Sequence, residues 1–165
     1  MSLCMQRRSI RKYDLKAVEE EKIKTLLKSA MQAPSARNQQ PWEFFVIKNK
    51  EILNKLSTIS RGAHMLNQAP VAILTVFKED VLAPHMRPQD LAAASQNILL
   101  EATNQGLGAV WIGVYPLEER MNNIKEVITI PNHLTPFSLI AIGYPDEDTQ
   151  IKQIRYDASR VHEIL

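Results

Sequence analysis

Hydrophobic and polar positions along this chain form stretches that predict both helices and strands. Residues 19–32 carry apolar side chains at helical spacing, and the glutamates at the start of this segment favour a helix because they face the positive end of its dipole. Residues 71–77 form a nearly unbroken apolar run, which is typical of a strand covered on both faces. The segment from Asp90 to Gln105 is apolar almost all round, so we expect a buried helix with Asp90 as its N-cap and Gly106 just beyond its end.

Shorter segments complete the pattern. The predicted further strands are rich in aromatic or β-branched residues, and the predicted short helices show helical spacing of apolar residues. The strands are residues 42–47, 109–114 and 136–143, and the helices are residues 50–57, 61–69 and 117–127. This irregular alternation predicts an α+β or α/β sandwich around one sheet of about four or five strands. We expect the 165 residues to form one domain, 1–165.

Charge is distributed unevenly along the chain. The hydrophobic fraction of 45% and the charged fraction of 23% are ordinary for a soluble globular protein, and the net charge is only +2. Residues 1–16 carry five basic side chains against one acidic one, which is a local charge of +4. Because the excess is local, a small anionic ligand explains it better than a nucleic acid does, and we expect no nucleic-acid partner.

The single cysteine, Cys4, excludes an internal disulfide and fits a reducing compartment. No apolar stretch approaches the roughly 20 residues that a membrane helix needs, and the N-terminus has no apolar signal region. We therefore expect a soluble, cytoplasmic protein without a membrane partner.

Several common chemistries lack their sequence motifs. No G-x-G-x-x-G lies between a strand and a helix, and neither a Walker A pattern nor a G-x-S-x-G elbow is present. The histidines have no metal-ligand spacing, so no metal site is expected; they are His64, His85, His133 and His162. Because no nucleophile or base stands out, an enzymatic reaction would have to be carried by a cofactor.

Four motifs occur in a fixed order along the chain. They are Arg7-Arg8-Ser9-Ile10-Arg11, the segment from Ala33-Pro34-Ser35 to Pro41-Trp42, the segment Gly106 to Gly113, and the C-terminal segment Arg155 to His162. Together they resemble the nitroreductase family of flavoproteins, which bind FMN. The second motif, A-P-S-A-x-N-x-Q-P-W, is the most specific of the four, and the resemblance covers nearly the whole chain.

The resemblance implies an α+β three-layer fold with a central, mostly antiparallel sheet flanked by helices. It also implies a homodimer that holds FMN at its interface. The implied activity is ping-pong hydride transfer from NADH or NADPH through flavin N5 to a nitroaromatic, a quinone or a similar small acceptor, and no side chain acts as a catalytic acid or base.

The resemblance also assigns cofactor-binding residues. The phosphate and the ribityl chain would meet Arg7, Arg8 and Ser9, and a positive charge near the N1/O2 edge of the ring would come from Arg11. The loop after the first long helix would reach the other chain's flavin with Pro34, Ser35 and Asn38.

The remaining expected contacts come from the second half of the chain. One contact would be a strand end that passes close to the ring and consists of Trp111, Ile112 and Gly113. It would offer a backbone N–H to flavin N5. The C-terminal segment would close over the phosphate with Arg155, and Arg160 is a second candidate.

Each assignment has a simpler alternative. The arginines could pair with surface carboxylates, Asn38 and Gln40 could cap turns, and Arg155 could be an ordinary tail charge. Trp42 fits a core position better than a ligand contact. The whole protein could instead remove a substituent reductively, as in dehalogenation, break down flavin, or bind flavin without turnover. Residues 78–88 are the candidate cover for the active site, and the few residues after Arg160 leave little chain to wrap a partner.

Overall fold

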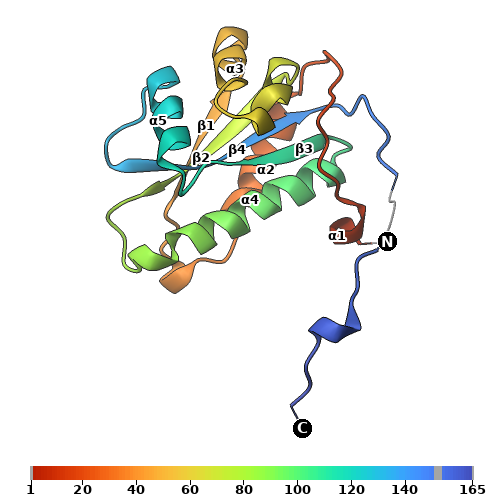
Figure 1. Ribbon diagram of the computed structural model, residues 1–165, viewed down its shortest axis with the longest axis vertical. Helices are drawn as coiled ribbons and strands as arrows, with labels where there is room; N and C mark the ends of the chain where they lie inside the picture. Colours follow the sequence, from red (N-terminus) through yellow and green to blue (C-terminus); the bar gives the residue numbers. More distant parts are fainter. Residues whose placement is uncertain (1, 151–153, 165) are drawn as a thin grey trace.

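A four-stranded antiparallel sheet forms the centre of the protein (Figure 1). The computed structural model describes residues 2–150 and 154–164. The strand order is β1-β2-β4-β3, and each neighbouring pair is antiparallel. The strands are β1 (Trp42–Ile47), β2 (Val71–Lys78), β3 (Gly108–Gly113) and β4 (Leu134–Gly143). The central strand β2 is buried from residue 71 to residue 77, which confirms the expectation drawn from its apolar run.

The helices cover both faces of the sheet. They are α1 (Leu3–Gln6), α2 (Glu20–Met31), α3 (Lys50–Leu56), α4 (Arg87–Asn104) and α5 (Glu118–Val127). Short 3-10 turns are η1 (Ala36–Asn38), η2 (Arg61–Asn67), η3 (Pro84–Met86) and η4 (Ala158–Arg160). The segment predicted as a helix at residues 61–69 is therefore the tighter 3-10 form.

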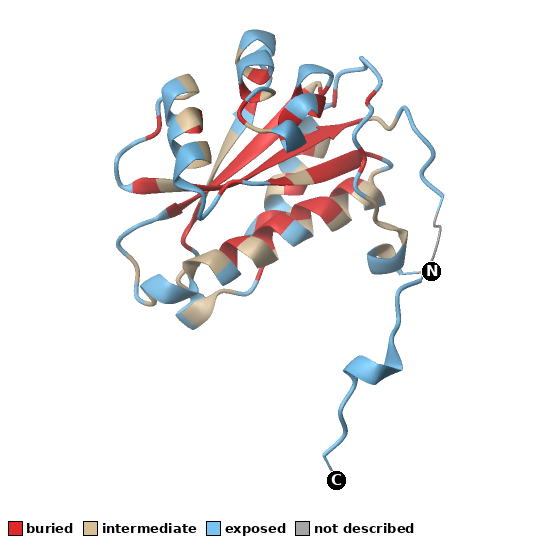
Figure 2. Ribbon diagram, in the orientation of Figure 1, coloured by how far each residue is buried: buried red, intermediate tan, exposed pale blue. Residues whose placement is uncertain are grey.

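Two hydrophobic cores lie between the layers. Figure 2 shows buried positions in the sheet and in the helices around it. One core lies between the sheet and helices α2 and α4, and the other lies between the sheet and α3, η2 and α5. Neighbouring residues of β2 alternate between them: Ile73 belongs to the first core and Leu74 to the second. The three-layer α+β architecture with an antiparallel sheet is confirmed.

Helix α4 begins earlier than the sequence predicts, and this corrects the role of Asp90. The helix starts at Arg87 with Met86 as its N-cap, so Asp90 lies inside the first turn. Pro88 is tolerated there because the first turn of a helix needs no intrahelical N–H. Asp90 is not the N-cap; it is a buried carboxylate that hydrogen-bonds to another segment of the chain.

The C-terminal residues 154–164 form an exposed tail that extends away from the body in Figure 1. The tail carries apolar side chains that are largely exposed: Ile154, Tyr156, Val161 and Ile164. None of the described helices is both long and apolar enough to cross a membrane.

Candidate functional site

The basic N-terminal segment, residues 7–13, lies along the edge of the sheet beside β3; we call it the arm. Ser9 forms a parallel bridge with Ala109, and the backbone N–H of Ile10 donates to the carbonyl oxygen of Ala109 at 3.1 Å. Gly108 allows this approach, because a Cβ there would lie 2.6 Å from Cγ2 of Ile10. The arm is thus held by backbone hydrogen bonds that do not depend on its charged side chains.

Two further side chains fix the course of the arm. The buried hydroxyl of Tyr13 lies 2.6 Å from the carbonyl oxygen of Ile10 and 3.2 Å from that of Ala141. Burial, together with the nearby carboxylate of Glu147, raises the pKa of Tyr13, so its hydroxyl stays protonated and available as a donor. Glu147 accepts the backbone N–H groups of Arg11 at 2.5 Å and Lys12 at 3.1 Å.

The charged side chains of the arm differ in their surroundings. Arg7 and Arg8 are half-buried, whereas Ser9 and Arg11 are exposed. Nη1 of Arg8 donates to the carbonyl oxygens of Asp148 and Gln150, both at 2.7 Å. Arg8 therefore binds the segment after β4 rather than a surface carboxylate. A guanidinium has five N–H donors, so these bonds leave donors for an anion.

Strand β3 is an edge strand of the sheet, and beyond the arm the Gly113 carbonyl on its outer edge accepts a hydrogen bond from Nη1 of Arg120 at 2.7 Å. The carbonyl of Ala109 faces the arm, so the alternation of strand groups directs the N–H groups of Trp111 and Gly113 to the same edge. A Cβ at Gly113 would meet nothing within 4 Å, which leaves open space at the end of the strand. The side chain of Ile112 is buried in the core, and Trp111 packs against Phe137 with ring centroids 5.7 Å apart.

A cavity of about 570 Å³ lies at the beginning of β3, next to the arm. It is lined by neutral residues, namely Gln6, Thr103, Gly106, Leu107, Pro145, Thr149 and Gln150. The guanidinium of Arg8 donates to the carbonyl of Gln150, which is one of these lining residues. Its volume falls within the range of roughly 300–1,000 Å³ that is usual for small-molecule sites.

The second candidate segment, residues 34–40, connects α2 to β1; we call it the 34–40 loop. Three of its residues have positive φ although none is glycine: Arg37 (53°), Asn38 (53°) and Gln40 (45°). Such a conformation costs about 1–2 kcal/mol per residue, so other contacts must hold the loop. Within the loop, Ser35 Oγ accepts the backbone N–H of Gln40 at 3.0 Å, and Asn38 Oδ1 accepts Nε2 of Gln40 at 2.9 Å.

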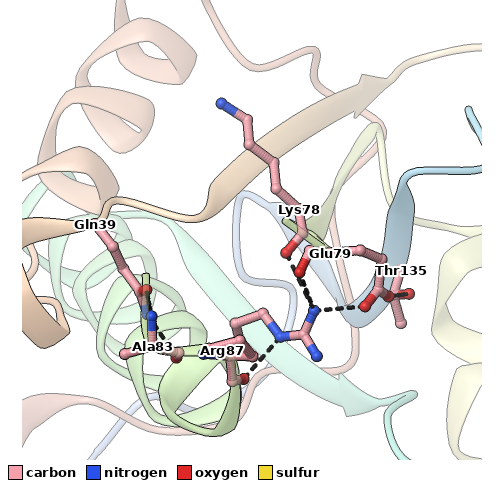
Figure 3. Close-up of polar contacts among 7 residues, drawn as sticks. Gln39, Lys78, Glu79, Ala83, Arg87 and Thr135 are labelled. Atoms are coloured by element: carbon pink, nitrogen blue, oxygen red, sulfur yellow. Dashed lines mark hydrogen bonds and ion pairs between the residues drawn. The ribbon is translucent and has the colours of Figure 1, made fainter. Parts of the chain in front are cut away.

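Asp90 and Gln39 connect the 34–40 loop to the rest of the protein. The Asp90 carboxylate accepts the backbone N–H of Ala36 at 2.9 Å through Oδ1 and Nε2 of Gln39 at 2.6 Å through Oδ2. The Gln39 amide also pairs with the backbone of Ala83, accepting its N–H at 2.7 Å and donating to its carbonyl at 3.1 Å (Figure 3). The loop is thereby joined to both α4 and the segment before it.

Residues 79–86 lie directly before α4; we call them the cover segment. Arg87, the first residue of α4, holds this segment through hydrogen bonds. Arg87 donates to the carbonyl oxygens of Pro84 and Glu79, both at 2.8 Å, and to the Glu79 carboxylate at 2.5 Å (Figure 3). Glu79 also accepts a hydrogen bond from Thr135. Partial burial opposes ionisation of Glu79, but the hydrogen bonds from Thr135 and Arg87 outweigh it, and the pKa of Glu79 lies below its usual value.

The structure brings some of the predicted site residues together and separates others. The arm lies beside β3, whereas Pro34, Ser35 and Asn38 belong to a loop joined to the first turn of α4. The arm's cavity reaches Thr103 near the other end of that helix, ~20 Å along its axis from Asp90 at 1.5 Å per residue. Within one chain, the cavity beside the arm and the 34–40 loop therefore lie well apart along α4.

Arg155 and Arg160 lie in the exposed tail. Within residues 2–150 and 154–164, no hydrogen bond or ion pair joins Arg155 to the arm, and Arg160 pairs with Asp157 of the tail itself at 3.2 Å. Trp42 is buried in the core, which confirms the simpler expectation for it.

Sequence reasoning missed the residues that support these segments. Tyr13, Glu147 and Gln39 were not singled out, because each acts through partners far away in the sequence. Asp90 was noticed only as a helix cap. Its one visible signal is an acidic residue directly before the apolar run at residues 91–94, where a charge that is buried needs a hydrogen-bonding partner.

Comparisons with known proteins agree on one family. The Nitroreductase family profile matches residues 4–64 and 60–144. A protein of Methanothermobacter thermautotrophicus, provisionally named NADH dehydrogenase/NAD(P)H nitroreductase, is 45% identical over 94% of this chain and 82% of its own length. A crystal structure from Clostridium acetobutylicum, provisionally named an NADH oxidase, superposes with a TM-score of 0.94 at 47% identity over 98% of both chains.

A solved structure with a bound cofactor is also similar to this chain. It is a protein of Desulfovibrio desulfuricans, provisionally named a nitroreductase and solved in complex with FMN, with a TM-score of 0.84 and 31% identity, covering 99% of this chain and 95% of the other. The family profile, the sequence relative and both solved structures lead to the same conclusion: the chain belongs to the nitroreductase family of enzymes.

Proposed function

We propose that the protein is an FMN-dependent oxidoreductase that takes reducing equivalents from NADH or NADPH and delivers them to a small acceptor such as a nitroaromatic or a quinone. Bound FMN would supply the redox chemistry, accepting hydride at N5 and passing electrons on. The observation that carries the proposal is the outer edge of β3, where the basic arm and the open space at Gly113 lie along one strand.

The residues along this edge fit a phosphorylated, flat cofactor. A Cβ at Gly113 would meet nothing within 4 Å, so the backbone there is open to close approach by a ring, and the N–H groups directed to the edge would provide donors for ring atoms. The guanidiniums of Arg7 and Arg8 suit a phosphate because they can form paired, charge-assisted hydrogen bonds. In the FMN-bound relative from Desulfovibrio desulfuricans, a chain of the same fold holds this cofactor.

Each segment has a defined task in the proposed enzyme. Arg7, Arg8 and Ser9 bind the phosphate and the ribityl chain. Arg11 places a positive charge at the N1/O2 edge, where negative charge develops on reduction. Trp111 and Gly113 offer backbone N–H groups to the ring, while Ile112 supports the strand from the core. No side chain needs to act as an acid or a base.

We infer that a complete site needs two chains. The arm and the 34–40 loop lie near opposite ends of α4, so two copies related by a twofold axis and packed along α4 would bring one chain's loop to the other chain's arm. Pro34, Ser35 and Asn38 would then serve the flavin of the partner subunit. The exposed apolar tail supports this assembly because it has surface to bury on a second copy, and Arg155 would reach the phosphate by that route.

A spectroscopic experiment tests the proposal. The purified protein should show flavin absorption, should bleach on addition of NADH or NADPH without oxygen, and should regain colour on addition of a nitroaromatic or a quinone. Addition of NAD⁺ is the control and should leave the spectrum unchanged. A colourless protein that FMN does not reconstitute would refute the assignment.

A further inference from the structure

The 34–40 loop and the cover segment meet at one side chain, the amide of Gln39. This amide has both of its heteroatoms in use: Oε1 accepts the N–H of Ala83, and Nε2 donates to the Ala83 carbonyl and to Asp90. Its orientation is therefore fixed by its partners. Reversing the amide would set the Ala83 N–H against the amide NH₂ and leave the Asp90 carboxylate facing an oxygen.

Asp90 accepts hydrogen bonds with both of its oxygens and is 4% exposed. An asparagine of the same shape would accept with one oxygen only, so either the Ala36 N–H or the Gln39 amide would face a second donor. An unpaired donor in a buried place is costly, so the carboxylate is required here for its hydrogen-bonding pattern. The first turn of α4 also suits a negative charge.

The backbone held by this pair is the strained part of the loop. Arg37 and Asn38 lie between Ala36, whose N–H binds Asp90, and Gln39, whose side chain binds Asp90 and Ala83. Both residues have φ of 53°, a conformation that persists where the surroundings over-determine it. Asp90 and Gln39 thus clamp the two ends of the segment that carries Asn38.

We propose that Asp90 and Gln39 are positioning residues that preset the 34–40 loop for the partner subunit's cofactor and couple it to the cover segment. The proposal rests on the proposed function for the identity of the ligand as FMN. Neither residue touches the cofactor; they act through Ser35, Asn38 and the backbone between them. Because Ala83 is bound to the same amide, a displacement of the cover segment is transmitted to the cofactor loop.

Two single variants and their combination test the proposal. Asp90→Asn and Gln39→Glu should each raise the FMN dissociation constant tenfold or more. In Asp90→Asn, the new amide NH₂ faces another donor, either the Ala36 N–H or the Gln39 amide. In Gln39→Glu, the new carboxylate faces the carboxylate of Asp90. In the double variant, the new carboxylate at position 39 can accept from the new amide at position 90 and from the Ala83 N–H. It should recover part of the lost affinity, because the Ala83 carbonyl still lacks its donor. Gln68→Glu, an exposed glutamine at the end of η2, is the matched control for added charge.

Hydrogen exchange provides a readout that does not depend on flavin. The Ala36 and Ala83 amides should exchange faster in the two single variants and regain protection in the double variant. FMN affinity within twofold of the parent in both single variants, or no recovery in the double variant, would overturn the proposal. If the parent itself binds no FMN, the proposed function fails, and equal exchange rates in parent and variants would then overturn the coupling separately.

Discussion

The arm and the 34–40 loop are both short irregular segments, but different contacts fix their conformations. The arm is extended and is fixed by backbone bonds to β3 and by the hydroxyl of Tyr13. The loop is folded into left-handed conformations and is fixed by the side chains of Asp90 and Gln39. The arm can therefore vary its charged side chains without losing its path, whereas the loop depends on the side chains of Asp90 and Gln39.

The largest expected effect on stability comes from disturbing the backbone contact between the arm and β3. Gly108→Ala would place a Cβ within 2.6–2.9 Å of three atoms of Ile10, whose side chain is buried. Such overpacking costs about 1–3 kcal/mol, so the melting temperature should fall by several degrees together with FMN retention. Gly113→Ala meets open space and should melt like the parent while still binding FMN more weakly.

Thermal melts of the cofactor-free proteins and fluorescence titrations with FMN separate these two effects. Equal melting temperatures for Gly108→Ala and the parent would show that the arm is not held by its backbone. Unchanged FMN affinity in Gly113→Ala would contradict the proposed position of the flavin ring at the end of β3.

A more local perturbation, which acts on FMN binding more than on folding, removes charge from the arm and leaves its backbone path intact. Arg8→Ala should weaken FMN binding by about 1.5–3 kcal/mol, the usual contribution of a hydrogen bond to a charged group, with a much smaller effect on folding. Arg8→Lys keeps the charge but loses the forked geometry, so its affinity should lie between those of Arg8→Ala and the parent. FMN titration measures all three proteins, and equal occupancy in Arg8→Ala and the parent would contradict the phosphate assignment.

The smallest expected effect concerns the Arg87–Glu79 contact that holds the cover segment. Because the pKa of Glu79 is lowered in the folded protein, its stabilising contribution is present above about pH 4.3, the usual value for glutamate, and is lost as the pH falls through the lower folded value. The carboxylate is 46% exposed, so screening limits the contribution to about 0.5 kcal/mol, or ~1–2 °C in melting temperature.

Melting temperatures of Glu79→Gln and the parent should differ at pH 7 and converge as the pH falls through the lowered pKa of Glu79. Glu126→Gln, at an exposed position on α5, is the control for removing one carboxylate. A constant difference at all pH values would show that the Glu79 charge is not what matters.

The sequence predicted the sheet more completely than it predicted the site. The strand at residues 42–47 was found with its observed bounds because its aromatic and β-branched residues are a local signal, and the same holds for the buried run at 71–77. The start of α4 was misplaced because Asp90 looks like a cap when its partners are unknown. Contacts such as Gln39 with Ala83 join positions 44 residues apart, and no local pattern reveals them.

The length of α4 has a consequence for mixtures of inactive variants of the protein. In the proposed dimer, the helix keeps the arm and the 34–40 loop apart within a chain, so every working centre would be assembled from halves that belong to different molecules. A copy with a faulty arm and a copy with a faulty loop can therefore complement each other, since their mixed pair joins the two intact halves on one side.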